Sequence, residues 1–163
     1  MPTMNFKIGN GIDIHQLKKG IPLILGGIKI KSKLGIEGHS DGDVLLHALV
    51  DALLGALALG DIGTFFPSNE KWKNCNSDFF LKEVLKKLKK QNYKISNIDS
   101  TIILQEPKIN IYIPKIKENL KKLTSLQKNQ ISVKATTTDY LGFIGDSKGI
   151  VAVTSVLIYK DNK

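Results

Sequence analysis

Residues 38–54, GHSDGDVLLHALVDALL, form the stretch that decides the fold. The pattern predicts a loop that runs into a helix over residues 44–59. Ser40 or Asp41 would cap the start of this helix, and Gly60 would end it. Four aliphatic residues recur at helical spacing and predict a face in the core: Leu46, Val50, Leu53 and Leu57.

The preceding segment, residues 6–15 (FKIGNGIDIH), alternates apolar and polar residues and predicts a strand. Its apolar side chains (Phe6, Ile8, Ile12 and Ile14) would share one face. Asp13 and His15 would share the other, because side chains two positions apart on a strand point the same way. Gly9 and Gly11 would let another group approach the strand backbone closely.

Asp13, His15 and His47 are the most informative combination of side chains. Two imidazoles and a carboxylate suit a divalent transition metal, most readily zinc. Three protein ligands leave the fourth tetrahedral position open, which is typical of catalytic sites. The alternative is that His47 is a core residue with a satisfied hydrogen bond, and the spacing alone leaves this open.

The rest of the chain alternates predicted strands and helices. A hairpin with Gly26 and Gly27 at its turn would cover residues 22–30, with a linker at 31–38 and a mobile, lid-like loop at 64–76. Further elements are expected at 77–91 (a helix with Ser77 as its cap), 95–106 (strand), 113–126 (helix), 131–135 (strand), 136–139 (turn), 141–149 (glycine-rich loop) and 150–159 (a central or interfacial strand). This order predicts one domain over residues 1–163. Its class is α+β, a mixed β-sheet with helices packed on one face and a small β-hairpin.

The net charge of +9 suggests anionic partners, but the composition favours a simpler explanation. The chain contains no Arg, and much of its Lys falls on the outer faces of two amphipathic helices. We therefore expect neither nucleic-acid binding nor membrane association. The single cysteine, Cys75, allows no disulfide framework and indicates a reducing compartment. The first residues lack the apolar region of a secretory signal.

Two polar segments could bind phosphate. His39 and Ser40 precede a helix N-terminus, where free amides and the helix dipole attract anions. The Thr136–Thr138 hydroxyls follow a strand, and Asp139 beside them could hold magnesium. Simple capping and an ordinary polar turn remain alternatives. No P-loop, dinucleotide fingerprint or nucleophile elbow is present, and Cys75 has no His nearby in sequence.

Several of these motifs occur together and in a characteristic order. They are DIH at 13–15, HSDGD at 39–43 followed by His47, ALLGA at 52–56, GDIG at 60–63, FP at 66–67 and VKATTT at 133–138. In this the chain closely resembles the 2-C-methyl-D-erythritol 2,4-cyclodiphosphate synthase family of non-mevalonate isoprenoid biosynthesis. The resemblance implies a homotrimer with active sites between subunits. It also implies conversion of 4-diphosphocytidyl-2-C-methyl-D-erythritol 2-phosphate to the cyclic diphosphate and CMP.

The resemblance also implies roles for individual residues. Asp13, His15 and His47 would bind one zinc ion per subunit, and Asp139 would place magnesium or manganese on the substrate diphosphate. His39 and Thr137 would stabilise the transition state. The implied substrate-binding residues are Asp13, His15, His39, Ser40, Asp61, Ile62, Gly63, Phe66, Pro67, Ser68, Leu104, Gln105, Glu106, Pro107, Lys108, Ile109, Asn110, Thr136, Thr137, Thr138, Asp139 and Phe143. Among them, residues 104–110 would line a cytidine pocket contributed by a different subunit from the zinc ligands.

Two positions depart from the family pattern. Asp139 stands where the family commonly has Glu, and Asp146 stands where it often has Arg. The reversed charge at Asp146 predicts weaker occupancy of the trimer's central channel by isoprenoid diphosphates, with Lys148 as a partial substitute. The alternative function is a catalytically weak homologue that binds cytidine nucleotides or isoprenoid diphosphates as a regulator. The resemblance implies the bacterial cytoplasm, or a plastid or apicoplast stroma if a transit peptide is missing.

Overall fold

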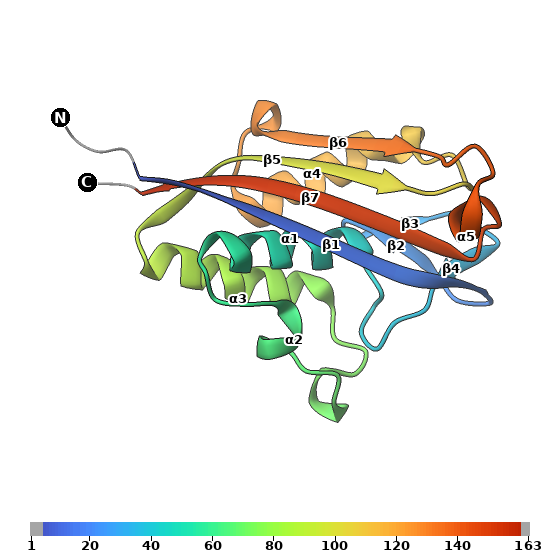
Figure 1. The fold of residues 1–163 in the computed structure, drawn as a ribbon, viewed down its shortest axis with the longest axis horizontal. Helices are drawn as coiled ribbons and strands as arrows, with labels where there is room; N and C mark the ends of the chain where they lie inside the picture. The colour runs from blue at the N-terminus through green and yellow to red at the C-terminus, as the bar shows by residue number, and fades with distance from the viewer. Residues whose placement is uncertain (1–4, 161–163) are drawn as a thin grey trace.

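The computed structural model describes residues 5–160; the ends of the predicted domain, residues 1–4 and 161–163, lie outside the described part (Figure 1). The strands are β1 (Phe6–Lys19), β2 (Leu23–Leu25), β3 (Ile28–Ile30), β4 (Leu34–Ile36), β5 (Tyr93–Ile103), β6 (Ile131–Thr136) and β7 (Gly149–Lys160). The helices are α1 (Val44–Ala56), α2 (Ile62–Phe65), α3 (Ser77–Lys90), α4 (Ile113–Thr124) and α5 (Gly142–Gly145). Short 3-10 turns are η1 (Glu70–Trp72), η2 (Asn110–Tyr112) and η3 (Lys128–Gln130).

Five strands form one mixed sheet in the order β4-β1-β7-β5-β6, and β2 and β3 form a separate hairpin. Only the β5–β6 pair of this sheet is parallel. β7 lies between β1 and β5, so the expectation that the last strand is central is confirmed. The apolar character of β7 follows from this position, since one face of the strand is covered and its edges are fully paired. The predicted α+β class with a mixed sheet and a hairpin is therefore confirmed.

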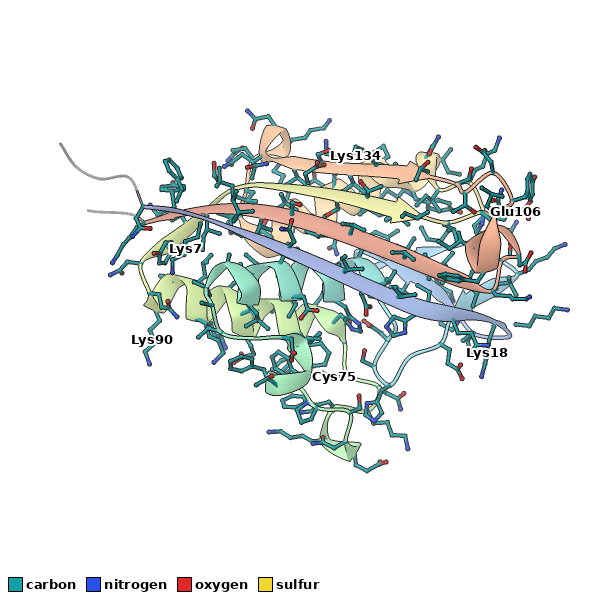
Figure 2. All side chains as sticks on the ribbon, viewed as in Figure 1. Lys7, Lys18, Cys75, Lys90, Glu106 and Lys134 are labelled. Carbon is teal, nitrogen blue, oxygen red and sulfur yellow. The ribbon has the colours of Figure 1, made fainter. Side chains whose placement is uncertain are left out.

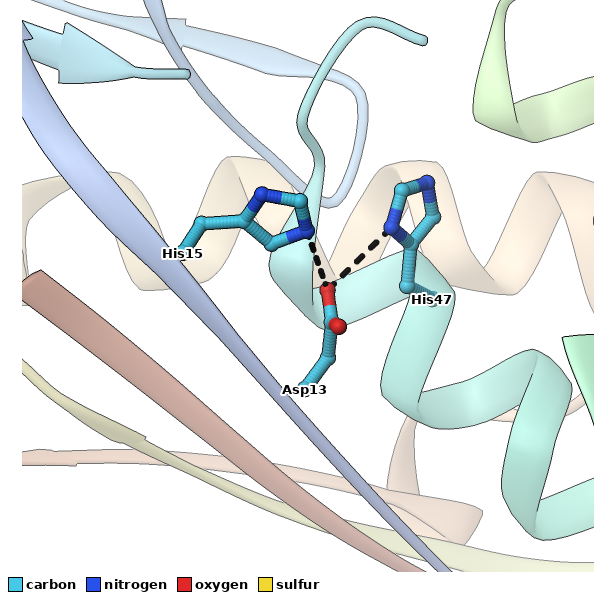
Figure 3. A group of neighbouring side chains, drawn as sticks. All are labelled: Asp13, His15 and His47. Atoms are coloured by element: carbon cyan, nitrogen blue, oxygen red, sulfur yellow. Dashed lines mark hydrogen bonds and ion pairs between the residues drawn. The ribbon is translucent and has the colours of Figure 1, made fainter. Parts of the chain in front are cut away.

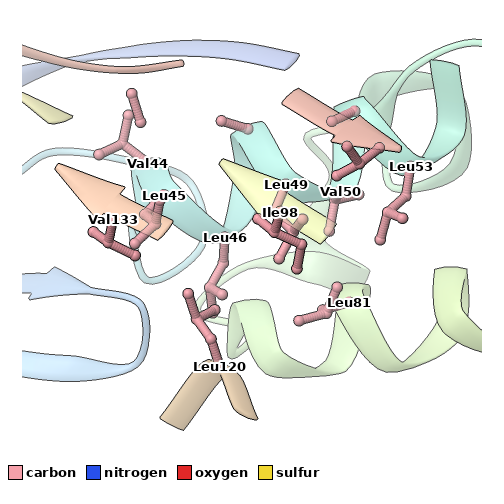
Figure 4. Close-up of a cluster of buried hydrophobic side chains, with 14 of the residues drawn as sticks. Val44, Leu45, Leu46, Leu49, Val50, Leu53, Leu81, Ile98, Leu120 and Val133 are labelled. Carbon is pink, nitrogen blue, oxygen red and sulfur yellow. The ribbon is translucent and has the colours of Figure 1, made fainter. Parts of the chain in front are cut away.

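The helix α1 forms the centre of the core (Figure 4). Nearly every side chain from Val44 to Ala56 is buried, so the single core face expected for this helix extends almost around it. The backbone of α1 lies directly on the backbone of β1. A Cβ atom at Gly9 would lie only 1.7 Å from the Ala52 carbonyl oxygen, so there is no room for a side chain there. A Cβ at Gly11 would meet the Ala48 oxygen at 1.9 Å. The predicted close approach to these two glycines is confirmed.

The cap of α1 differs from the expectation. Asp43, rather than Ser40 or Asp41, accepts the Leu46 N–H at 3.1 Å. The buried Asp43 carboxylate also accepts the Gly26 N–H at 2.9 Å and the Gly27 N–H at 2.7 Å. One side chain thus joins the turn of the β2–β3 hairpin to the start of α1. Gly26 and Gly27 lie far from Asp43 in the sequence. The local sequence pattern therefore could not single out Asp43, and it favoured the neighbouring Ser40 or Asp41 as the cap.

Other element boundaries also differ. α1 ends at Ala56, and Ala58, with φ of 56°, takes the left-handed position that Gly60 was expected to fill. Asn76 caps α3, with its side chain accepting the Asp78 N–H at 2.9 Å, whereas Ser77 is already inside the helix. The expected linker at 31–38 contains β4, which pairs with the end of β1.

The segment predicted as a polar loop, residues 64–76, contains the second half of α2 and the turn η1. It is also rich in aromatic contacts. Phe66 lies against Phe80 of α3 with ring centroids 4.5 Å apart, and Trp72 stacks on Phe79 at 5.7 Å. Because the partners lie beyond the segment, its own lack of periodicity gave no sign of this packing.

The helices α1, α3 and α4 pack on one face of the sheet and share one hydrophobic core. The opposite face of β1 carries Phe6, Ile8, Ile12 and Ile14, which are between 49% and 69% exposed. The prediction that these four side chains share a face is confirmed. In the single chain that face is uncovered.

Lysine residues occur on several elements of the fold. Lys7 and Lys18 both lie on β1, Lys90 ends α3, and Lys134 lies on β6 (Figure 2). Lys134 pairs with Asp99 at 2.5 Å, and Lys18 pairs with Glu37 at 2.5 Å. None of the helices within residues 5–160 has the length and apolar character needed to cross a membrane.

Candidate metal centre

Asp13, His15 and His47 converge at the contact between β1 and α1 (Figure 3). The Asp13 Oδ2 atom lies 2.9 Å from His15 Nε2 and 3.1 Å from His47 Nδ1. Strand alternation directs Asp13 and His15 to the same side, towards the helix that carries His47. Close packing over the two glycines of β1 brings the helix near enough for all three side chains to meet.

These contacts alter the ionisation of the strand residues. Burial alone would raise the pKa of Asp13, but hydrogen bonds from His15 and His47 outweigh it and lower the pKa to about 2. The hydrogen bond to Asp13 raises the pKa of His15. The carboxylate is therefore ionised at neutral pH and carries negative charge between two imidazole rings.

The remaining nitrogen of each imidazole has its own partner. His15 Nδ1 lies 2.6 Å from the Glu37 carbonyl oxygen, so it donates there and leaves Nε2 for the centre of the group. His47 Nε2 lies 3.1 Å from Ser40 Oγ and 2.9 Å from Ser77 Oγ. The two histidines thus direct opposite ring atoms, Nε2 and Nδ1, towards Asp13.

The group fits a divalent metal ion. The three ligand atoms lie within 4.8 Å of one another, and each is of a type that zinc accepts. The carboxylate supplies charge, and both imidazoles are oriented by hydrogen bonds through the opposite nitrogen, as metal-ligating histidines usually are. The alternative of a simple core histidine is disfavoured, because His47 shares its carboxylate with a second imidazole.

A segment expected to bind substrate lies beside this group. Asp51, one turn after His47 on α1, accepts the Ile62 N–H at 2.7 Å. Asp61 caps the short helix α2 by accepting the Thr64 N–H at 2.8 Å, and its side chain is exposed. Burial, with the nearby carboxylates of Asp13 and Asp61, raises the pKa of Asp51. The Asp61–Gly63 segment is thereby fixed to the helix that carries His47.

His39 and Ser40 lie on the other side of the group. His39 is exposed, and its carbonyl oxygen accepts the Asn74 N–H at 3.0 Å. Ser40 contacts His47 rather than the end of α1. Both residues precede Asp43, the actual cap, so they lie near the helix start without occupying its free amides. Phe66, Pro67 and Ser68 follow α2, with Pro67 and Ser68 exposed.

A second polar region forms where β5 and β6 end. Gln105 accepts the Tyr140 N–H at 3.0 Å, which joins the segment after β5 to the loop after β6. The Asp139 N–H lies 3.3 Å from Thr137 Oγ1. A cavity of about 810 Å³ opens here, lined by Lys19, Lys31, Ser32, Lys33, Leu34, Gln105, Glu106, Pro107, Lys108, Thr137, Tyr140 and Ser147.

The other residues expected here are distributed as follows. Leu104 and Ile109 are buried, Asn110 is exposed, and Thr136 ends β6 on an exposed surface. Thr138 donates its hydroxyl to the Leu141 carbonyl at 2.8 Å. Phe143 is 49% exposed and packs against Gly149. Of the residues expected to bind substrate in this region, Gln105, Glu106, Pro107, Lys108 and Thr137 line the cavity, and these six do not.

The two regions do not meet within one chain. β7 and β5 lie between β1, which carries Asp13, and β6, which leads to Thr137. With neighbouring strands about 4.8 Å apart, this separation is roughly 14 Å. The group at Asp13 and the residues around Thr137 and Asp139 are therefore two separate partial sites.

Asp146, one of the two unusual positions, pairs with Lys148 at 3.0 Å on the surface. Lys148, which was expected to substitute in part for the family's Arg, is thus paired with Asp146. This ion pair partly neutralises the positive charge of Lys148, which leaves less charge to attract an anionic ligand.

Three residues beside the metal ligands were not expected to contribute to the site. Ser77 and Asp41 were interpreted as helix caps, and Asp51 was given no role. For Asp51, its spacing of four from His47 on a helix was a usable signal. For Ser77, thirty positions from His47, the spacing gives none.

The fold and this group of side chains define an α+β domain with a two-histidine, one-aspartate group that fits a metal ion. The chain belongs to the YgbB family, whose model matches residues 6–159. This confirms the resemblance noted from the motifs.

Curated relatives support the same assignment. The chain is 54% identical over 151 residues to the 2-C-methyl-D-erythritol 2,4-cyclodiphosphate synthase of Francisella philomiragia, covering 90% of this chain and 94% of that protein. It is 49% identical to the synthase of the same name from Geobacillus sp., covering 95% and 99% of the two chains.

Solved structures have the same fold. IspF of Plasmodium falciparum, in a complex with CDP, is 38% identical with a TM-score of 0.87, and the match covers 97% of this chain and 98% of that one. The bifunctional IspDF of Campylobacter jejuni is 39% identical with a TM-score of 0.94. That match covers 98% of this chain and 44% of the bifunctional chain.

Proposed function

We propose that this chain catalyses the family reaction, as a 2-C-methyl-D-erythritol 2,4-cyclodiphosphate synthase. In that reaction the 2-phosphate of 4-diphosphocytidyl-2-C-methyl-D-erythritol 2-phosphate attacks the β-phosphate. A new phosphorus–oxygen bond closes the ring, and the bond between the β-phosphate and CMP breaks. The single observation that carries the proposal is the convergence of Asp13, His15 and His47 in a chain of this family.

The reaction needs charge stabilisation more than a base. The attacking phosphate is already anionic, so two anions must be held together and in line. A zinc ion held by Asp13, His15 and His47 would supply Lewis-acid stabilisation of phosphate oxygens. Ser40, which contacts His47, and its neighbour His39 would donate hydrogen bonds to the same phosphate. The lack of an evident nucleophile–base pair agrees with this chemistry.

The remaining substrate contacts follow from the two partial sites. Asp61 and Gly63 would bind the methylerythritol hydroxyls, with Ile62 fixed between them by Asp51. Residues 104–110 and Thr136–Thr138 would bind the cytidine and diphosphate groups at the second region. Asp139 would hold magnesium or manganese with the diphosphate, Thr137 would stabilise the transition state, and Phe143 would support the loop. The CDP complex of the Plasmodium relative supports the cytidine assignment.

A homotrimer would unite these regions. The apolar face of β1 is exposed to solvent in the single chain, and β1 lies about 14 Å across the sheet from β6, the strand that leads to Thr137. If the uncovered sheet faces of three chains pack together, the metal group of one subunit can meet the cytidine region of its neighbour. The active site would then lie between subunits.

Release of CMP from the diphosphocytidyl substrate tests the proposal. We expect the chain loaded with zinc and magnesium to release CMP and the cyclic diphosphate in equal amounts. His47→Ala should abolish release, whereas Asn76→Ala, a change at a nearby helix cap, should not. Binding of CDP without CMP release would contradict the proposal and favour a regulatory homologue.

A further inference from the structure

The two nitrogens of His47 lie in different surroundings. Nδ1 faces Asp13 Oδ2 at 3.1 Å, while Nε2 lies 2.9 Å from Ser77 Oγ. Ser77 belongs to the first turn of α3, and none of its surface is exposed to solvent. A buried hydroxyl from a different helix is thus in hydrogen-bond contact with a candidate metal ligand.

The partners of Ser77 determine the direction of that hydrogen bond. Ser77 Oγ also contacts Asp41 Oδ1. Asp41 Oδ1 accepts the Asp43 N–H at 3.1 Å, and Oδ2 accepts the Ser77 N–H at 2.9 Å, so both oxygens act as acceptors. The one hydroxyl proton of Ser77 therefore goes to Asp41, and its oxygen accepts the His47 Nε2–H.

We infer that Asp41 and Ser77 are positioning residues that keep a proton on His47 Nε2 and so reserve Nδ1 for the metal. In His15 a single backbone contact has the same effect: Nδ1 donates to the Glu37 carbonyl oxygen, which leaves Nε2 free for the metal. Outer partners of metal-ligating histidines commonly change metal affinity by about 10–100-fold when they are removed. The inference rests on the proposed metal-binding role of the three ligands.

The direction of the hydrogen bonds suggests two informative substitutions. In Asp41→Asn one acceptor oxygen becomes an NH2 group, which has to face either the Ser77 hydroxyl or the Ser77 N–H. Either way one of the two hydrogen bonds that hold the Ser77 side chain in place is lost, and the fixed acceptor of the His47 Nε2–H is lost with it. Ser77→Ala removes the nearer, buried acceptor of the His47 Nε2–H and leaves only the partly exposed Ser40 Oγ at 3.1 Å, whereas Ser77→Thr keeps a hydroxyl at position 77.

Asn76→Ala is the matched control. Asn76 caps the same helix through the Asp78 N–H but does not contact His47. It therefore disturbs the start of α3 without changing the hydrogen bonds of the imidazole. A merely structural role for Ser77 would make these two substitutions alike.

The test combines zinc competition against a chromophoric chelator with proton NMR of the imidazole N–H groups. We expect a slowly exchanging His47 Nε2–H resonance in the parent and in Ser77→Thr, and its loss in Ser77→Ala and Asp41→Asn. Zinc affinity should fall about 10–100-fold in the latter two and stay at the parental value in Ser77→Thr and Asn76→Ala.

Parental zinc affinity and an unchanged Nε2–H resonance in Asp41→Asn would overturn the inference. An equal loss of affinity in Asn76→Ala would also overturn it, because the effect would then come from the helix position. If the parent binds no zinc, the proposed metal site fails, and the Nε2–H resonance of the metal-free variants still decides the role of Asp41 and Ser77.

Discussion

The Nδ1 atom of His47 lies 3.1 Å from Asp13 Oδ2, and this contact joins the central helix α1 to the strand β1. The residues that permit it are Gly9 and Gly11, over which the helix backbone passes without room for a side chain. The packing of the core and the geometry of the candidate metal site thus depend on the same helix–strand contact.

Gly11→Ala should disrupt both the packing of α1 on β1 and the geometry of the candidate metal site. The new Cβ would lie 1.9 Å from the Ala48 carbonyl oxygen, and neither backbone can move without displacing α1. We expect the free energy of unfolding to fall by about 3 kcal/mol or more and zinc binding to weaken. Urea unfolding and zinc competition measure the two effects.

Gly55→Ala is the control for that substitution. Gly55 lies in the same helix, but a Cβ there would be 3.9 Å from its nearest neighbour, the Asn10 carbonyl oxygen. Replacing a helical glycine by alanine should stabilise the protein by about 0.5–1 kcal/mol. Equal destabilisation by both substitutions would contradict the argument from close packing.

Zinc binding should weaken as the pH falls. The hydrogen bond to Asp13 raises the pKa of His15, and a metal ion can bind only the unprotonated nitrogen. Below that raised pKa, apparent zinc affinity should fall about tenfold per pH unit for each displaced proton. Titrations at several pH values measure the slope, and His39→Asn, outside the three ligands, should leave it unchanged.

Asp43 should give the stability of the chain a distinct pH dependence. Burial raises the pKa of Asp43 from 3.8 to about 6, so the folded state binds a proton more tightly than the unfolded state. The resulting stabilisation is complete below pH 3.8 and is lost as the pH rises through about 6. Relative to Asp43→Asn, the parent should lose on the order of 3 kcal/mol between these limits.

Urea unfolding of both proteins from pH 4 to pH 7 checks this prediction. Asp61 provides the opposite case, because hydrogen bonds from Thr64 lower its pKa. The contribution of Asp61 to the free energy of unfolding should be present above the pKa that Asp61 has in the unfolded chain, and it should be lost as the pH falls through the lowered pKa of the folded state. A parent that gains stability over Asp43→Asn as the pH rises would contradict the assignment.

Ile12→Asp tests the proposed trimer. Ile12 is 59% exposed on the uncovered face of β1, and a carboxylate there would be buried unpaired in an assembly through that face. Light scattering should report a trimer for the parent and a monomer for the variant. Lys90→Asp, at the end of α3, should remain trimeric; a monomeric parent would contradict the proposal.

The convergence of Asp13, His15 and His47 could be predicted from the sequence because local periodicity fixes side-chain direction. Alternation on the strand placed Asp13 and His15 together, and helical spacing set His47 on the buried helix. The two glycines gave a further signal for close packing. These features each depend on a few neighbouring residues.

Contacts between distant segments could not be predicted in this way. Asp43 was not singled out as the cap because its other partners, Gly26 and Gly27, lie in a separate hairpin. Ser77 was interpreted as a helix cap from its local sequence. Its contact with His47 could not be predicted, because the contact forms only when α3 packs on α1. The aromatic packing of Phe66 on Phe80 likewise depends on tertiary structure.

Anomalous diffraction from zinc-loaded crystals tests the central claim most directly. We predict one peak per chain, bonded at about 2.0–2.2 Å to an Asp13 carboxylate oxygen, His15 Nε2 and His47 Nδ1. A peak at other residues, or none at this position with zinc in excess, would contradict the account.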